Sequence, residues 1–204
     1  HDVLRPTSAA EVTIEANPLD VSEAAIEAFR RCGINRVSLG VQSLNALTLS
    51  TLDRDHREDD VRQVMHLLLD SGFTVSVDLI IAAPEQTLDA VGRDLEAITS
   101  LGAQHISVYC LTWEQGTAFW GKRARGSLTP VAEDVEREMF ELAIDHLSSS
   151  GYQQYEVSNF AQPEMMCRHN EAYWDCRPWE AFGPGAARFD GRNRITNIRS
   201  TSAW

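Results

Sequence analysis

The sequence contains few cysteines and no long apolar run. Its four cysteines, at positions 32, 110, 167 and 176, never show the C-x-x-C spacing of a zinc ribbon or a redox motif. Four scattered cysteines are too few for a disulfide scaffold, so we expect a reducing, cytoplasmic compartment. The apolar stretches, such as residues 79–84, are far shorter than the roughly 20 residues that a membrane-spanning helix needs. We therefore expect no membrane span.

Basic residues and nucleotide-binding motifs are also scarce. Lys and Arg total 18 against 30 Asp and Glu, a net charge of −12. A chain this acidic repels phosphate backbones, so we expect no nucleic-acid partner. The motifs G-x-G-x-x-G and G-x-x-x-x-G-K-[ST] are absent, and nucleotide-phosphate binding therefore has no motif support. At 204 residues the chain can form one core with an appendage but falls short of a full (β/α)₈ barrel of about 250.

What is present is an alternation of strand and helix patterns. Period-two alternation or short apolar runs predict strands at 11–15, 36–41, 74–81, 105–111 and 154–158. Helical spacing predicts helices between Ser22 and Gly33 and at 44–52, 59–70, 87–101 and 132–149. A loop separates residues 111 and 132, and no regular periodicity is visible after residue 159. This order predicts an α/β fold with right-handed βαβ units and a parallel sheet, open or barrel-shaped.

Polar side chains lie at the ends of several predicted strands. Glu15 ends the first strand, Gln42 and Thr112 follow the second and fourth, Asp78 lies within the third, and Arg54 comes shortly after the second. Ligands of parallel α/β folds bind at the carboxyl edge of the sheet. The carboxylates can hold an ammonium group or a ribose diol, and the Arg and Gln side chains can hold a carboxylate. Together they suit a zwitterionic ligand with a sugar, although ordinary ion pairs at a barrel rim would use the same residues.

A metal-dependent hydrolase is the alternative enzyme class. Asp78 could share a metal ion with His56, His66 and His105. No two histidines have the H-x-H or H-E-x-x-H spacing of such sites. His66 lies among apolar residues of a predicted helix and fits a helix flank better than a metal site. The hydrolase hypothesis is therefore the weaker one.

A second cluster of functional side chains lies in the segment after residue 159. Arg168–Trp174 has the sequence RHNEAYW, and Trp179 and the glycines of FGPGA follow it. His169 could be an axial ligand of haem iron, with Tyr173, Trp174 and Trp179 stacking on the macrocycle. From the residues alone, a packed aromatic loop in which His169 makes a structural hydrogen bond is the favoured interpretation.

Several segments together resemble a known family. They are IEANP (14–18), GINRVSLGVQSLN (33–45), DRDH (53–56), VDLIIAAPEQT (77–87), HISVYCLTWEQGT (105–117), YEVSNFAQP (155–163), RHNEAYW (168–174) and FGPGA (182–186). In this order they resemble the radical S-adenosylmethionine family of oxygen-independent coproporphyrinogen III oxidase-like proteins. YEVSNFA followed by R-H-N-x-x-Y-W resembles the haem-chaperone branch of that family. The resemblance implies a partial (β/α) barrel with outer helices over residues 1–158, followed by an aromatic and glycine-rich extension over 159–204.

The resemblance also implies ligands and partners. Cofactors would be S-adenosylmethionine, a [4Fe-4S] cluster that reduces it to a 5′-deoxyadenosyl radical, and haem. The residues implied for S-adenosylmethionine are Glu15, Gln42, Arg54, Asp78, Ile80 and Thr112, and those for haem are His169, Asn170, Tyr173 and Trp174. The partners would be acceptor haemoproteins, with a homodimer left open. The alternatives are oxidative decarboxylation of coproporphyrinogen III and a haem-binding module without radical chemistry.

Departures from the family pattern limit these expectations. The chain contains neither the cluster motif C-x-x-x-C-x-x-C nor the glycine-rich segment that contacts the methionine moiety. We therefore expect a fragment, incomplete at both ends, that cannot assemble the cluster and is inactive alone. Asp53 replaces a common glycine, Ala82-Ala83 replaces Gly-Leu, and Ala187 replaces a common histidine that would be a second haem ligand.

Overall fold

The computed structural model describes residues 6–203. Its main feature is one mixed six-stranded sheet. The strand order is β1-β2-β3-β4-β6-β5, with β1 to β4 parallel and β5 and β6 antiparallel. The strands are β1 Thr13–Ala16, β2 Arg36–Gln42, β3 Thr74–Ile81, β4 His105–Cys110, β5 Gln153–Gln154 and β6 Asn159–Ala161. The predicted α/β class with a mostly parallel sheet is therefore confirmed.

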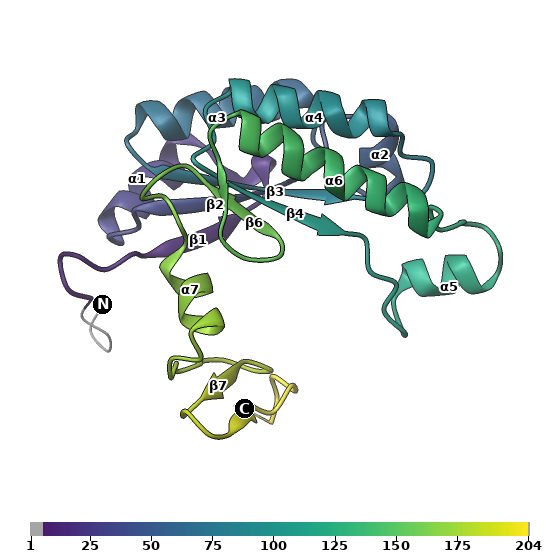
Figure 1. The fold of residues 1–204 in the computed structure, drawn as a ribbon. Helices are drawn as coiled ribbons and strands as arrows, with labels where there is room; N and C mark the ends of the chain where they lie inside the picture. Colours follow the sequence, from purple (N-terminus) through teal and green to yellow (C-terminus); the bar gives the residue numbers. More distant parts are fainter. Residues whose placement is uncertain (1–5, 204) are drawn as a thin grey trace. The chain divides into compact units, whose positions relative to one another are not determined.

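Helices join the parallel strands and cover one face of the sheet (Figure 1). The connecting helices are α1 Glu23–Arg31, α2 Ala46–Thr51, α3 Glu58–Asp70 and α4 Leu88–Ser100, with a 3₁₀ turn at Pro18–Asp20. After β4 follow α5 Ala118–Ala124 and α6 Glu133–Ser149. The side chain of Ser22 caps α1, as predicted, by accepting a hydrogen bond from the Ala25 amide at 3.2 Å. Figure 1 shows α3, α4 and α6 side by side above the sheet.

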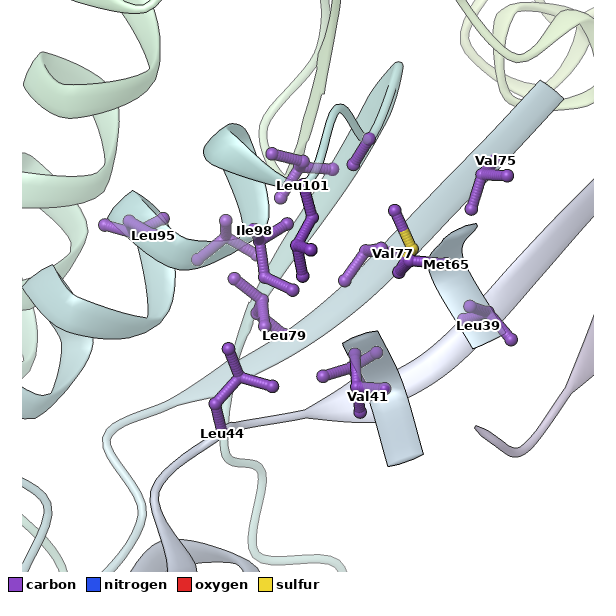
Figure 2. Close-up of a cluster of buried hydrophobic side chains, with 14 of the residues drawn as sticks. Leu39, Val41, Leu44, Met65, Val75, Val77, Leu79, Leu95, Ile98 and Leu101 are labelled. Atoms are coloured by element: carbon purple, nitrogen blue, oxygen red, sulfur yellow. The ribbon is translucent and has the colours of Figure 1, made fainter. Parts of the chain in front are cut away.

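The apolar core lies between this helical layer and the sheet. Side chains alternate along a strand, so Leu39 of β2 and Val77 of β3 point toward the helices and are fully buried. Figure 2 shows Val77 beside Met65 of α3, and Leu39 and Ile98 of α4 belong to the same buried cluster. Burying a leucine- or valine-sized side chain contributes roughly 1.5–3 kcal/mol. The core thus fixes the strands and, with them, the direction of their alternate residues.

The opposite face of the sheet is polar. Gly40 of β2 lies beside Asp78 of β3, Asp78 beside Ser107 of β4, and Ser107 beside Asn159 of β6. These residues alternate with the buried apolar positions and therefore point away from α3, α4 and α6. Glu15 joins this face through its pairing with Ser38. The fold thus turns a row of polar side chains from separate strands toward the same side.

Two details of the predicted secondary structure are wrong. Of the expected strand at 154–158, only Gln154 lies in a strand, β5, and residues 155–158 form the connection to β6, with a bend at 156–158. There the Glu156 carboxylate accepts a hydrogen bond from the Ser158 amide at 2.9 Å, and this local bond competes with strand pairing. The expected loop before residue 132 contains α5, whose first turn is capped by Thr117. A helix this short has too few turns to show a clear period.

The chain divides into two units, one ending at Met165 and the other starting at Met166. The predicted domain limit between residues 158 and 159 stays a prediction. The second unit, in which no periodicity was expected, contains α7 Arg168–Trp174 and an antiparallel hairpin of β7 Ala187–Phe189 and β8 Arg194–Thr196. Within residues 6–203, no helix combines the length and apolarity needed to cross a bilayer.

Candidate functional site

A cavity of about 540 Å³ opens on the polar face, at β1, β2 and β3 and the loop after α2. Four of the predicted site residues line it together: Glu15, Gln42, Arg54 and Asp78. The remaining lining residues are Ile14, Ala16, Asn17, Asp20, Ala25, Phe29, Ser38 and Gly40. The volume falls in the range of about 300–1,000 Å³ typical of small-molecule sites. The structure therefore places residues from four separate segments around one cavity of suitable size.

Two carboxyl groups dominate one side of the cavity. Burial raises the pKa of Asp78, the hydroxyl groups of Ser107 and Ser38 lower it, and the nearby charge of Glu15 raises it. The Ser38 hydroxyl donates to Asp78 Oδ2 at 3.2 Å. Carboxylate oxygens accept hydrogen bonds and attract cations. This side can therefore hold a pair of hydroxyl groups or a positively charged group.

Gln42 enters the cavity from an irregular strand end. The register between β2 and β3 shifts between Gly40 and Gln42, and Gln42 has a φ of 65°. A Cβ on Gly40 would lie 2.9 Å from Gln42 Nε2, closer than real Cβ contacts allow. Because Gly40 has no side chain, the Gln42 amide can occupy the space next to it.

Arg54 is placed by the end of α2. The amide of Arg54 donates to the Leu49 carbonyl at 2.9 Å, and the amide of Asp53 donates to the Ser50 carbonyl at 3.3 Å. This is a Schellman motif, in which the residue after the C-cap is left-handed and usually glycine. Asp53 fills that position with a φ of 52°, and aspartate tolerates this conformation better than most residues. Although Asp53 replaces a glycine, the chain keeps the Schellman motif, and this motif places Arg54 at the cavity.

Two predicted residues lie outside the cavity lining. Ile80 is half-buried on the same face of β3 as Asp78, and Thr112 is exposed just after β4. Their predicted role beside an adenosine group stays a prediction. Ser38 and Phe29 also line the cavity and were not predicted from the sequence. The period-two alternation of Ser38 with Gly40 could have indicated the first of them.

The candidate residues of a metal-dependent hydrolase are dispersed. His56 is buried and donates from Nε2 to the Val41 carbonyl at 2.8 Å. His105 begins β4 and lies 2.7 Å from the Tyr155 hydroxyl, and His66 is exposed on α3. In the part of the chain that the structure describes, no three His, Cys, Asp or Glu side chains gather into a group able to hold a metal ion. These residues fit neither the hydrolase metal nor an iron–sulfur cluster.

In the second unit, α7 brings the predicted haem residues onto two turns of one helix. The His169 ring lies 4.7 Å from the Tyr173 ring, centroid to centroid, one helical turn away. Tyr173 stacks on Trp179 at 4.0 Å, and Trp179 contacts Phe189 of β7 at 5.0 Å. Trp174 and His169 are exposed, and Asn170 is half-buried. Tyr173 and Trp179 thus pack on one another and on Phe189, as in the packed aromatic loop favoured from the residues alone. The exposed imidazole of His169 lies beside these rings, and its role as a haem ligand stays a prediction.

Comparisons with known proteins agree with the predicted family. The sequence profile of the Radical SAM superfamily matches residues 4–98, which include Glu15, Gln42, Arg54 and Asp78. Proteins named "Heme chaperone HemW" are 37% identical over 189 residues in Lactococcus lactis and 38% identical over 205 residues in Mycobacterium tuberculosis. These alignments cover 92% and 100% of this chain. They cover 50% and 52% of the relatives, so the chain spans about half their length.

The fold also has a solved counterpart. Coproporphyrinogen III oxidase HemN from Escherichia coli, a radical SAM enzyme, matches 97% of this chain and 48% of its own with a TM-score of 0.80. At 21% identity this likeness concerns the fold alone. The sequence profile and the sequence relatives confirm the family that the motifs predicted. The chain belongs to the radical S-adenosylmethionine superfamily and is related to its haem-chaperone members.

Proposed function

We propose that this chain binds S-adenosylmethionine in the cavity of its first unit and haem on its second unit, as part of a haem chaperone that delivers haem to acceptor haemoproteins. One observation carries the first half of the proposal: Glu15, Gln42, Arg54 and Asp78 line the same cavity. The names of the relatives support the second half.

The cavity suits a zwitterionic nucleoside. Arg54 is the cationic group of the lining and can pair with the carboxylate of the amino acid. Glu15 and Asp78 can accept hydrogen bonds from ribose hydroxyls, and their negative charge attracts a sulfonium. The Gln42 amide can donate or accept. The four side chains therefore recognise the features that distinguish S-adenosylmethionine from a nucleotide: a carboxylate, a positive centre and no phosphate.

Haem binding is proposed for α7 and the hairpin. His169 is the only histidine after His146 in the sequence, and it is exposed beside the Tyr173–Trp179 stack. A neutral imidazole nitrogen can bond to haem iron, and flat aromatic rings can pack against the porphyrin. Ala187 of β7 offers no second imidazole. We therefore propose a single histidine ligand from this chain.

The nucleoside site is tested by titration calorimetry with S-adenosylmethionine, on protein expressed with whatever coding sequence flanks this chain. Asp78→Asn and Glu15→Gln should each weaken binding by about tenfold, the value of a hydrogen bond to a charged group. Asp89→Asn is the matched control, since Asp89 is an exposed carboxylate on α4 outside the cavity. Absence of binding by the wild type would reject the proposal.

The haem site is tested by titrating haemin and following the Soret band. His169→Ala should lose the spectrum of histidine-ligated haem. His66→Ala, which removes an exposed histidine of α3, should leave it unchanged. An identical spectrum in the His169 variant would remove that residue from the site. Conversion of coproporphyrinogen III by the full protein would favour the oxidase instead of the chaperone.

A further inference from the structure

The backbone around Gln42 is held in an uncommon turn. The Ser43 amide donates to the Val41 carbonyl at 2.7 Å, so the hydrogen bond closes around Gln42 alone. With a φ of 65° at its centre, this is a γ-turn of the rare type. Such conformations cost of order 1–3 kcal/mol and persist only where the surroundings impose them. Some other part of the fold must therefore stabilise the turn.

One support comes from α4. Asp94 is buried, and its carboxylate accepts from the Ser43 hydroxyl at 2.5 Å and from the Leu44 amide at 3.0 Å. Ser43 is fully buried and its hydroxyl also accepts from the Asn45 amide at 3.0 Å. The Asp94 carboxylate thus accepts hydrogen bonds from both residues that follow Gln42. Burial of a carboxyl group is costly without such partners, which indicates that this contact has a definite role.

A second support comes from the loop that carries Arg54. His56 follows Arg54 by two residues, and its Nε2 donates to the Val41 carbonyl at 2.8 Å. That carbonyl is the one that closes the turn at Gln42. His56 therefore joins the chain segments of two cavity residues by a single buried hydrogen bond.

We propose that Asp94 and His56 are positioning residues of the nucleoside site: Asp94 fixes the turn that carries Gln42, and His56 ties this turn to the loop that carries Arg54. The inference rests on the proposed function of the cavity. Neither residue lies in the cavity lining, since Asp94 acts through Ser43 and Leu44 and His56 acts through Val41. Loss of either contact lets the turn relax, and the Gln42 amide then leaves its place over Gly40.

The test is the dissociation constant for S-adenosylmethionine, measured by calorimetry on the full protein at a temperature where every variant is folded. Asp94→Leu and His56→Leu keep the approximate volume without the polar groups and should each raise the constant about tenfold. Asp94→Asn and His56→Gln restore an acceptor and a donor, and each should recover most of the affinity.

A double-mutant cycle separates positioning from general damage. If Asp94 acts through Gln42, Asp94→Leu should change the constant less than about twofold in a Gln42→Ala background. Ser76→Ala is the control, because it removes a buried partner of Arg36 at the other end of the strands; it should lower stability and leave affinity unchanged. The inference would be overturned if Asp94→Leu lost the same affinity in the Gln42→Ala background as in the wild-type background, or if both leucine variants bound like the wild type. Either result would leave the proposed function standing. A wild type that binds nothing would overturn the proposed function, and this inference with it.

Discussion

At the scale of single residues, the backbone conformation explains substitutions that composition cannot. Asp53 and Ala82 stand where the resembled family commonly has glycine, and both have positive φ, 52° and 60°. The chain therefore keeps the left-handed conformation at these positions without the residue best suited to it. Pattern analysis could identify the substitutions but could not show that the geometry is retained, because φ is not encoded in hydrophobic periodicity.

His105 makes stability depend on pH. Burial lowers its pKa from 6.5 to about 3, and the charge of Arg36 adds to this. Its Nδ1 is buried without a hydrogen-bond partner among residues 6–203. Below pH 6.5 the unfolded chain binds a proton that the folded chain refuses, so stability should fall by up to about 1.4 kcal/mol per pH unit down to the folded pKa. Asp78 and Asp94 act oppositely, since their pKa is raised.

The measurement is urea denaturation of the wild type and His105→Gln at pH 7, 6 and 5. The difference between the two unfolding free energies should narrow or reverse in favour of the variant as the pH falls. Because the carboxyl groups titrate in both proteins, their contribution cancels in the difference. Parallel curves over this range would show that His105 does not control the dependence.

At the scale of secondary-structure elements, β2 serves both the core and the cavity. Val37, Leu39 and Val41 face the helices, while Ser38 and Gly40 line the cavity. Alternation predicted this strand well, and helical spacing likewise predicted α3, α4 and α6 within a residue or two. The irregular end of β2 was not predictable from alternation, because the side chains that hydrogen-bond to it, His56 and Asp94, come from other segments of the chain.

Gly40→Ala tests the close approach in β2. The new Cβ would lie 2.9 Å from Gln42 Nε2, so the flexible amide must move out of its place. Because only a side-chain end is displaced, affinity for S-adenosylmethionine should fall several-fold while stability changes by less than about 1 kcal/mol. Calorimetry and urea denaturation of the same samples give both quantities.

Gly92→Ala in α4 is the matched control. A Cβ there meets only Leu142 Cδ2 at 3.9 Å, so replacing this helical glycine should add roughly 0.5–1 kcal/mol of stability. Its ligand affinity should equal that of the wild type. Unchanged affinity in Gly40→Ala would mean that the Gln42 amide does not contact the ligand.

At the scale of the whole molecule, the cavity exists because parallel strands end at a common edge. Glu15, Gln42, Arg54 and Asp78 come from four segments of the sequence and meet only in the folded sheet. Strand order and polar strand ends were enough to predict that they converge. Ile80 was predicted from the resemblance alone and Thr112 also from its place after a strand, and both lie outside the lining. The parallel topology therefore predicted which strands meet at the cavity, but it could not predict that the residue after β4 lies outside the lining.

Because the cavity forms only on folding, its ligand should stabilise the molecule by mass action. S-adenosylmethionine at 100 times its dissociation constant should raise the unfolding free energy by about 2.7 kcal/mol. Arg54→Ala should abolish most of this gain at the same concentration, since it removes the cation of the lining. Arg93→Ala removes an exposed arginine of α4, paired with Asp89, and should keep the full gain. Thermal unfolding with increasing ligand measures all three proteins. A gain that is equal in the two variants would mean that the ligand binds elsewhere, because only a site that includes Arg54 can distinguish them.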